Sequence, residues 1–226
     1  MGERIWLAWS SGKDSALTLH IIQQDSRWSH FEVCALLCTI TEDYGRVSMH
    51  GVRRELVLAQ AESIGIPLAE VLIPAKCTND AYEEAMRTAL EAAARDGIVG
   101  VAFGDIHLSD VREYRERQMA RVGMTPVFPL WGMKPSEVAL KFLSLGFKAV
   151  VVCVDSKQLD PALCGREYDE SFLSELPELV DPCGENGEFH TFVYDGPTFT
   201  KPIEIQRGKV IMRDERFAFC DLTLGR

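Results

Sequence analysis

The chain has 226 residues, of which 46% are hydrophobic and 26% charged, so it can bury a large core and is not expected to be disordered. Its formal net charge of -10 gives an overall field that repels phosphate backbones, which argues against nucleic acid as a partner. Its seven cysteines include no C-x-x-C pair, which argues against a zinc site or a disulfide scaffold and favours a reducing compartment.

Continuous apolar runs alternate with helical patterns over the first two thirds of the chain. This alternation is typical of a parallel sheet with helices on both faces. The expected strands are residues 5–9, 33–40, 68–73, 98–103, 126–128 and 149–154, and the expected helices are residues 13–24, 51–64, 80–95, 110–122 and 135–145. The sequence therefore predicts an α/β fold with a Rossmann-like, doubly wound parallel sheet.

Several of these helix ends carry capping signals. Asp80 and Asp110 are each followed three positions later by a glutamate, which predicts that each is an N-cap residue. Pro135 suits a first helical turn, and Gly146 suits the position just past a helix end.

The pattern changes to short strands beyond about Pro177. These strands are expected at residues 189–194, 202–206, 209–213 and 217–222. Arg207 and Gly208 separate the middle pair at the spacing of a hairpin. We expect a smaller α+β region that begins between residues 130 and 160, and we divide the chain into a nucleotide-binding domain, residues 1–130, and a C-terminal substrate-binding region, residues 131–226.

The stretch SSGKDS, residues 10–15, follows the first expected strand and opens the first helix. Small residues let the backbone approach a ligand, Gly12 can take a positive φ without penalty, and the start of the helix offers free N–H groups. Lys13 adds a full positive charge. The pattern is not a Walker loop, because Leu7 and Asp14 occupy positions where that loop needs glycine and Ser or Thr. SSGKDS therefore predicts a site for nucleotide phosphates; the alternative is a helix cap with a stray lysine.

The same stretch resembles, residue by residue, the S-G-G-K-D-S loop of the PP-loop ATP pyrophosphatases, in the adenine nucleotide alpha hydrolase-like (HUP) superfamily. That resemblance implies cleavage of ATP to AMP and pyrophosphate. Ser11 stands where the family usually has glycine, so its Cβ could crowd a phosphate. The residues implied to bind the nucleotide are Ser10, Ser11, Gly12, Lys13, Asp14 and Ser15.

Three further stretches resemble the diphthine-ammonia ligase family: GVAFGDIHLSDVREYRER (100–117), LWGMKPSEVALKFLSLGFKAVVVCV (130–154) and CGENGEFHTFVYDGPTF (183–199). The resemblance implies that a substrate carboxylate attacks the α-phosphorus of ATP, giving an acyl adenylate and pyrophosphate, and that ammonia then displaces AMP. The implied cofactors are ATP and Mg²⁺, with Asp14 and Asp105 as candidates to hold the metal. The implied acceptor is diphthine on translation elongation factor 2.

The ENGE segment, residues 185–188, and the residues after it are the candidates to contact the acceptor substrate. Gly184, Asn186 and Gly187 can form a tight turn that aims Glu185 and Glu188 from a loop, and His190 alternates to one face of the following strand. With the resemblance, the catalytic set becomes Lys13, Asp14, Glu185, Glu188 and His190. The alternative is a capped turn with solvated carboxylates and a satisfied histidine.

Gly104 and Asp105 follow the fourth expected strand. By resemblance they lie near the nucleotide, with the strand end on adenine and Asp105 holding a ribose hydroxyl, a metal or a loop. An ordinary cap at the approach to a helix is the alternative for Asp105.

Two basic stretches each have two possible roles. His50, Arg53 and Arg54 lie where a helix begins, which suits an anionic group, but surface charge explains them equally. Arg112 belongs to a helix pattern with alternating charges, for which a solvated, ion-paired face is favoured over a phosphate contact.

Two other functions stay in view: a tRNA-modifying enzyme of the same superfamily, and a nucleotide sensor that binds ATP or AMP without chemistry. The negative net charge and the absence of C-x-x-C pairs argue against the tRNA-modifying enzyme. No signal peptide or apolar run of membrane length is visible, so we expect a cytoplasmic protein with no membrane partner. A homodimer is plausible for a compact enzyme of this size.

Overall fold

A mainly parallel sheet forms the first part of the computed structural model, which describes residues 2–225. Its strands are β1 (Glu3–Ala8), β2 (Phe31–Thr41), β3 (Arg46–Val47), β4 (Leu68–Ile73), β5 (Gly100–Ala102) and β6 (Thr125–Val127). The parallel order is β4-β2-β1-β5-β6, and the short β3 joins the end of β2 in the antiparallel direction. The predicted Rossmann-like α/β fold is confirmed. Because the chain builds outward from β1 first to one side and then to the other, the end of β1 is a topological switch point, where such sheets bind ligands.

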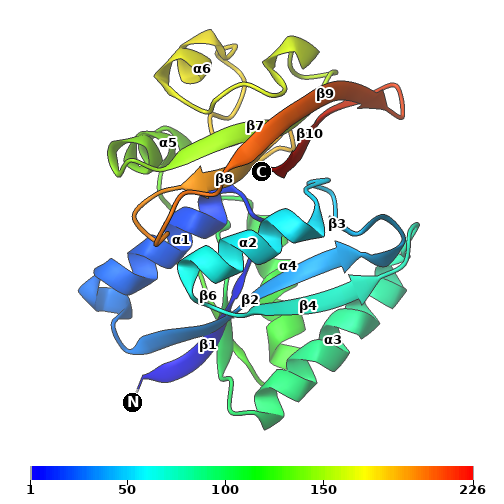
Figure 1. The fold of residues 1–226 in the computed structure, drawn as a ribbon. Helices are drawn as coiled ribbons and strands as arrows, with labels where there is room; N and C mark the ends of the chain where they lie inside the picture. Colours follow the sequence, from blue (N-terminus) through cyan, green and yellow to red (C-terminus); the bar gives the residue numbers. More distant parts are fainter. Residues whose placement is uncertain (1, 226) are drawn as a thin grey trace.

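Helices cover both faces of this sheet, as the continuous apolar strands predict (Figure 1). The helices are α1 (Lys13–Gln24), α2 (Arg54–Ile64), α3 (Asn79–Arg95) and α4 (Ser109–Arg121), with short 3-10 turns η1 (Ser26–Trp28) and η2 (Glu42–Tyr44). α1 and α2 pack into one apolar cluster, and α3 and α4 pack into a second cluster. The two clusters lie on opposite faces of the sheet, so its strands are buried from both sides.

A second, antiparallel sheet carries the C-terminal part of the chain. Its strands are β7 (Lys148–Asp155), β8 (Phe189–Asp195), β9 (Ile205–Arg213) and β10 (Phe217–Leu224), accompanied by α5 (Pro135–Ser144), η3 (Pro161–Leu163) and α6 (Glu170–Glu175). The order is β8-β7-β10-β9. Figure 1 shows this sheet against α1 and α2, on the side away from the parallel sheet. The strand expected at 149–154 therefore exists but is not a member of the parallel series; its continuous apolar run reflects a central position between β8 and β10.

The predicted hairpin turn at Arg207 and Gly208 is wrong. β9 runs unbroken through both residues, and the turn lies between β9 and β10, where Asp214 and Glu215 have φ of 51° and 52°. Gly208 instead sits where the register between β9 and β10 shifts, and a Cβ on it would lie 2.7 Å from the backbone oxygen of Asp221. Gly208 therefore marks a β-bulge. In the sequence, a glycine at a bulge inside a strand looks the same as a glycine in a turn.

The two predicted N-caps are also wrong, whereas the two signals around α5 are confirmed. Thr78 caps α3, since its Oγ1 accepts a hydrogen bond from the Ala81 backbone N–H at 3.3 Å, and α4 begins at Ser109 without a side-chain cap. Asp80 and Asp110 lie in the first turns, where a negative charge is favourable without capping. Pro135 opens α5, and Gly146 follows its end with φ of 81°.

None of the helices in residues 2–225 combines the length and the hydropathy that a membrane crossing requires.

Candidate functional site

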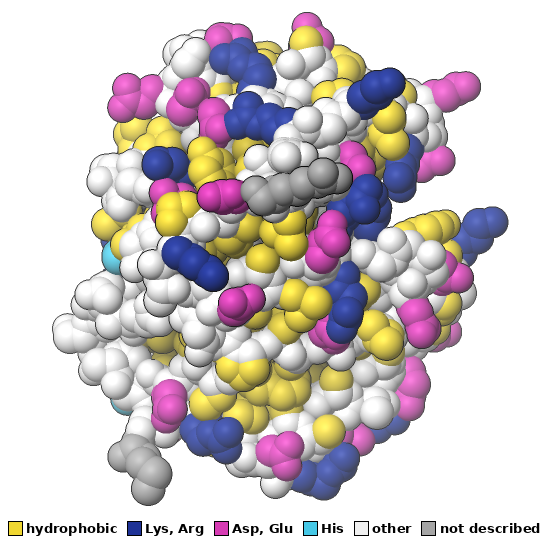
Figure 2. All heavy atoms as spheres, in the orientation of Figure 1, with side chains coloured by type: hydrophobic (Ala, Val, Ile, Leu, Met, Phe, Trp, Pro, Cys, Tyr) yellow, Lys and Arg dark blue, Asp and Glu magenta, His cyan; other side chains and the backbone are white. Residues whose placement is uncertain are grey.

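A cavity of about 1080 Å³ opens at the carboxyl edge of the parallel strands. Its walls come from the turn after β1, the ends of β2, β4 and β5, the loop before β8, and the β9–β10 turn. Figure 2 shows the surface hollowed on the right, between the lower part with the parallel sheet and the upper part with the antiparallel sheet. The cavity therefore lies where both sheets contribute side chains.

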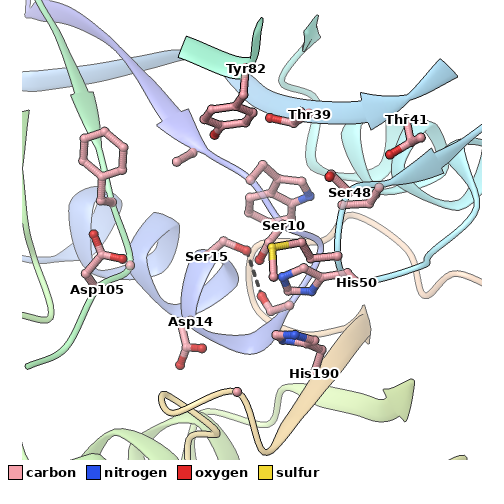
Figure 3. Close-up of a pocket in the computed structure, with 18 of the residues that line it drawn as sticks. Ser10, Asp14, Ser15, Thr39, Thr41, Ser48, His50, Tyr82, Asp105 and His190 are labelled. Carbon is pink, nitrogen blue, oxygen red and sulfur yellow. Dashed lines mark hydrogen bonds between the residues drawn. The ribbon is translucent and has the colours of Figure 1, made fainter. Parts of the chain in front are cut away.

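The SSGKDS turn forms the floor of this cavity. Ser10, Gly12, Lys13, Asp14 and Ser15 line it, and Figure 3 shows Ser10, Asp14 and Ser15 around the start of α1. The first-turn N–H groups of a helix have no partner within the helix, so this end of α1 presents donors and a partial positive charge. The Lys13 N–H is already engaged, because it donates to Thr191 Oγ1 at 3.1 Å. The turn is therefore fastened to β8 while the rest of the helix start faces the cavity.

The backbone of this turn differs from the prediction in one respect. Gly12 has φ of -92° and ψ of 176°, an extended conformation, whereas Ser11 takes the left-handed conformation with φ of 71°. The Ser11 carbonyl accepts hydrogen bonds from Gln60 Nε2 and from the Val193 N–H, both at 3.0 Å. These two bonds hold the strained peptide in place, at a cost on the order of 1 kcal/mol for a non-glycine residue.

Gly12 is required for space rather than for φ, because a Cβ on it would lie 3.2 Å from the Thr191 carbonyl oxygen. Ser11 itself is fully buried beneath the turn, and its Oγ has no hydrogen-bond partner among residues 2–225. Its side chain points away from the cavity, so the predicted crowding of a phosphate by the Ser11 Cβ does not arise.

Lys13 is the buried cation of the site. Its Nζ lies 2.7 Å from Asp14 Oδ2 and also donates to the Cys183 carbonyl oxygen. Burial alone would lower the pKa of Lys13, but the neighbouring acidic groups, led by Asp14, prevail and raise it. Lys13 therefore keeps its charge at neutral pH although only 2% of its surface is exposed.

Three carboxyl groups gather around this lysine. Burial raises the pKa of Asp14, of Asp105 and of Glu185, and for Glu185 the value reaches about 7. The negative charge of Asp14 adds to the shift of Glu185. Asp14 Oδ1 and Asp105 Oδ2 are buried and accept no hydrogen bond from residues 2–225. Carboxyl groups with raised pKa values, and oxygens that accept no hydrogen bond, are suited to binding a cation or to exchanging protons.

The end of β5 brings Gly104 and Asp105 to α1, as the resemblance implied. A Cβ on Gly104 would lie 3.1 Å from the backbone of Asp14, so a larger residue would push these two segments apart by a few tenths of an ångström. Asp105 does not cap α4, whose N-cap position is Leu108. It faces the cavity (Figure 3), and its Oδ2 lies 3.6 Å from Arg115 Nε.

Glu185 and Glu188 have different places, although the sequence grouped them. Glu185 lines the cavity and accepts a hydrogen bond from the Ile106 N–H at 3.2 Å. Glu188 is 2% exposed, and its carboxylate accepts from the backbone N–H groups of Asp181 and Asn186 and from the Asn186 amide. With its oxygens occupied inside the loop, Glu188 shapes the turn that carries Glu185 and does not reach the cavity, contrary to the prediction for it.

His190 projects into the cavity and meets His50, which comes from the loop between β3 and α2 (Figure 3). The ring centroids are 4.1 Å apart at an angle of 30°. The other basic candidates lie outside the cavity, because Arg53 pairs with Asp221 and Arg54 pairs with Glu70.

Arg112 lies over the rings of Phe128 and Trp131 and pairs with Glu116. It therefore belongs to an ion-paired helix face, and the structure does not support a contact between Arg112 and a phosphate. Sequence reasoning missed Gln60, Thr191 and Arg115. Of these, Gln60 had a signal, namely a polar residue on the apolar face of α2.

Comparisons with known proteins identify the family of this chain. The family model described as the diphthamide synthase N-terminal domain matches residues 3–126, and the model described as its C-terminal domain matches residues 134–223. A curated relative from Bos taurus, named diphthine--ammonia ligase, is 30% identical over 142 residues, which cover 60% of this chain and 53% of the relative. The relative of the same name from Homo sapiens is 29% identical over 143 residues, covering 61% and 53%.

The relative of this name from Danio rerio is 30% identical over 175 residues, covering 70% of this chain and 68% of the relative. The chain thus spans about half the length of the mammalian relatives that it matches. A solved structure described as a predicted subunit of tRNA methyltransferase from Methanocaldococcus jannaschii is 15% identical with a TM-score of 0.42, over 66% of this chain and 80% of that one. With its two family models matching nearly end to end, the chain belongs to the diphthamide synthase family.

Proposed function

We propose that this protein is an AMP-forming ligase that converts a substrate carboxylate into an amide with ATP and ammonia. The observation that carries the proposal is the turn after β1, which presents the start of α1 and the charged Lys13 to a cavity shared by both sheets. Helix starts with a nearby lysine bind phosphates, and this one lies at the switch point of the sheet.

The proposed first step is attack of the carboxylate on the α-phosphorus of ATP, with release of pyrophosphate. Negative charge then builds on the phosphate oxygens, and donors fixed in advance stabilise it without rearrangement. Ser10, Gly12, Lys13 and Ser15 line the cavity floor and are proposed to hold the phosphates. The end of β5, with Gly104, is proposed to lie beside the adenosine part.

Mg²⁺ is the cation that suits this site. It prefers oxygen ligands and is held by one or two carboxylates together with substrate phosphates. Asp14 and Asp105 meet this requirement, because each has a buried oxygen that accepts no hydrogen bond in the described chain, although Asp105 Oδ2 also lies 3.6 Å from Arg115 Nε. We propose that these two residues hold the metal, which would offset the repulsion between the carboxylates and the phosphates.

The acceptor is proposed to be diphthine on translation elongation factor 2, because the curated relatives carry the name diphthine--ammonia ligase. The cavity continues outward from the phosphate turn to Arg216 and Phe217 on the β9–β10 turn, which leaves space for a protein-borne side chain beside the nucleotide. Glu185 and His190 line the part of the wall between these two regions.

The test is an assay for AMP and pyrophosphate with purified protein, ATP, Mg²⁺, ammonium and elongation factor 2 that carries diphthine. The proposal expects AMP, pyrophosphate and new amide in equal amounts. AMP formation that requires tRNA in place of the factor would identify a tRNA-modifying enzyme, and ATP binding without AMP under every condition would identify a sensor. Neither alternative is favoured by a feature of the site.

Three further expectations belong to this proposal. Residues 1–130 and 131–226 are proposed to be the nucleotide-binding and the acceptor-binding domain, which limited proteolysis near residue 130 tests. The seven free cysteines suit the reducing cytoplasm, which fractionation of cells tests. A homodimer is tested by analytical ultracentrifugation.

A further inference from the structure

Two histidines far apart in the sequence meet on the cavity wall. The rings of His50 and His190 lie against each other with 4.1 Å between centroids and a tilt of 30°, and both line the cavity next to the phosphate turn. His190 immediately precedes Thr191, whose hydroxyl accepts the Lys13 N–H. The pair therefore lies beside the place proposed for the α-phosphate, on a side to which β8 and the loop before α2 both contribute (Figure 3).

The loop that carries His50 is held in a strained conformation. The residues on either side of His50, Met49 and Gly51, both have positive φ, 65° and 73°. A Cβ on Gly51 would lie 2.9 Å from the ring of Phe219, so the loop packs on β10 as closely as a backbone allows. Strain of this kind costs about 1–3 kcal/mol for a residue such as Met49 and persists where the surroundings fix it.

Salt bridges fasten the same loop to the second sheet. Arg46 donates to the Gly51 carbonyl oxygen at 2.7 Å and pairs with Asp221 of β10 at 2.9 Å. Arg53, on the other side of the loop, pairs with Asp221 at 2.6 Å. His50 is thus fixed from both ends, and its ring stays against His190.

Each neutral imidazole of the pair has one nitrogen without a proton, which can accept a hydrogen bond. His50 Nδ1 is buried and has no hydrogen-bond partner in the described chain. Burial, together with the charge of Lys13, lowers the pKa of His190 to about 4, and burial and the neighbouring His190 hold the pKa of His50 well below its usual range. The charged groups on the adjoining walls are Lys13 and Asp14 of α1, Glu185 of the loop before β8 and Arg216 of the β9–β10 turn.

We propose that His50 and His190 form the ammonia side of the site: the unprotonated nitrogen of each ring accepts a hydrogen bond from NH₃, and His190 takes the proton that the amine loses. This inference rests on the proposed ligase function. The nitrogen lone pair of NH₃ forms the new C–N bond to the acyl adenylate, and the C–O bond to AMP breaks, with its electron pair leaving on AMP. The proton released by the nitrogen passes to His190 and then to water. His50 is a positioning residue that holds the His190 ring and the ammonia.

Uncharged imidazoles suit this role better than the carboxylates nearby. Close to Lys13, a second cation is disfavoured in the resting site, so the wall selects neutral ammonia over ammonium. The positive charge on His190 arises only as the amide forms, when the anion AMP is leaving beside it. The three N–H groups of ammonia need acceptors, and its lone pair has to stay free for attack. A neutral ring nitrogen accepts without competing for that lone pair, and it can take up one proton.

The experiment separates the two half-reactions in His50→Gln and His190→Gln. Glutamine keeps a hydrogen-bond acceptor but takes up no proton at neutral pH. Exchange of pyrophosphate into ATP in the presence of the acceptor, which needs no ammonia, is expected to fall far less than amide formation does. Ammonia-dependent amide formation is expected to fall roughly 10²–10⁴-fold in His190→Gln, mainly in kcat, because a general base contributes about that factor. His50→Gln is expected to raise the KM for ammonia.

Replacing ammonia by hydroxylamine distinguishes a role in proton transfer from a purely structural role. Its nitrogen is less basic than that of ammonia, so its adduct loses a proton without help, and His190→Gln is expected to lose far less hydroxamate formation than amide formation. His30→Gln is the matched control, because His30 stacks on Phe31 at 4.0 Å on the surface and does not line the cavity. If His190→Gln fails to fold, as judged by its melting curve, His190→Asn takes its place.

Wild-type rates of amide formation with ammonia in both folded variants would overturn the inference, as would an equal loss with ammonia and hydroxylamine. Failure of the proposed function itself has a different signature: the wild-type protein would then show neither pyrophosphate exchange nor AMP formation with the diphthine-bearing factor.

Discussion

Replacing Lys13 tests the phosphate site, but the structure shows that the simple variant also perturbs folding. Lys13 and Asp14 form an ion pair at 2.7 Å with side chains 3% and 25% exposed. Lys13→Met leaves the Asp14 carboxylate buried without its partner, and removal of one member of a buried pair costs ~3–5 kcal/mol. In a chain of this size each kcal/mol lowers the melting temperature by about 2–4 °C, so we expect a drop of roughly 6–20 °C.

The double variant Lys13→Met, Asp14→Asn separates stability from activity. Replacing both members of a buried pair by neutral groups is often close to neutral, so most of the lost melting temperature is expected to return. AMP formation, measured by chromatography of the nucleotides below the melting temperature of each variant, is expected to remain abolished in both. Wild-type AMP formation by folded Lys13→Met would refute the role of Lys13, and an uncorrected melting temperature in the double variant would refute the energetic reasoning.

Three other substitutions address the scaffold and the titration of the site. Gly100→Ala is expected to lower the unfolding free energy strongly in a denaturant titration, since its Cβ would lie 2.3 Å from the Thr125 carbonyl oxygen; a wild-type midpoint would contradict the packing of β5 on β6. Gln60→Leu removes the hydrogen bonds to the Ser11 and Val193 carbonyl oxygens and from the Trp9 indole, so it should both raise the KM for ATP and lower the melting temperature; an unchanged KM would disprove the clamp. The pKa of Glu185 rises from its usual 4.5 to about 7, so the folded protein binds this proton more tightly than the unfolded chain, and stability should fall as the pH rises from 4.5 to 7. Glu185→Gln should flatten that fall in thermal melts, and an unaltered pH profile would contradict the shift.

The parallel sheet and the phosphate turn were predictable because local signals specify them. Continuous apolar strands separated by helices leave few arrangements, and the SSGKDS segment follows β1 at the edge where such sheets bind ligands. The conformation inside the turn was not predictable. A glycine suggests positive φ, but at Gly12 the need is for room against Thr191, and Gln60, far away in the sequence, holds Ser11 in the left-handed conformation.

The loop of residues 181–188 illustrates the same limit. The spacing of Glu185 and Glu188 suggested two carboxylates with one purpose. Which of them faces the cavity depends on the Asp181 and Asn186 N–H groups, which capture Glu188. The pairing of His50 with His190 likewise follows from the packing of β8 beside the loop before α2, a contact between segments that no local pattern encodes.

The central claim is that the turn after β1 holds the phosphates of ATP, and a crystal structure with a non-hydrolysable ATP analogue and Mg²⁺ tests it most directly. The account predicts phosphate oxygens within about 2.7–3.2 Å of backbone N–H groups at the start of α1, with the α-phosphorus facing the side of the cavity where His190 lies. Nucleotide bound elsewhere, with the turn free of phosphate, would contradict it.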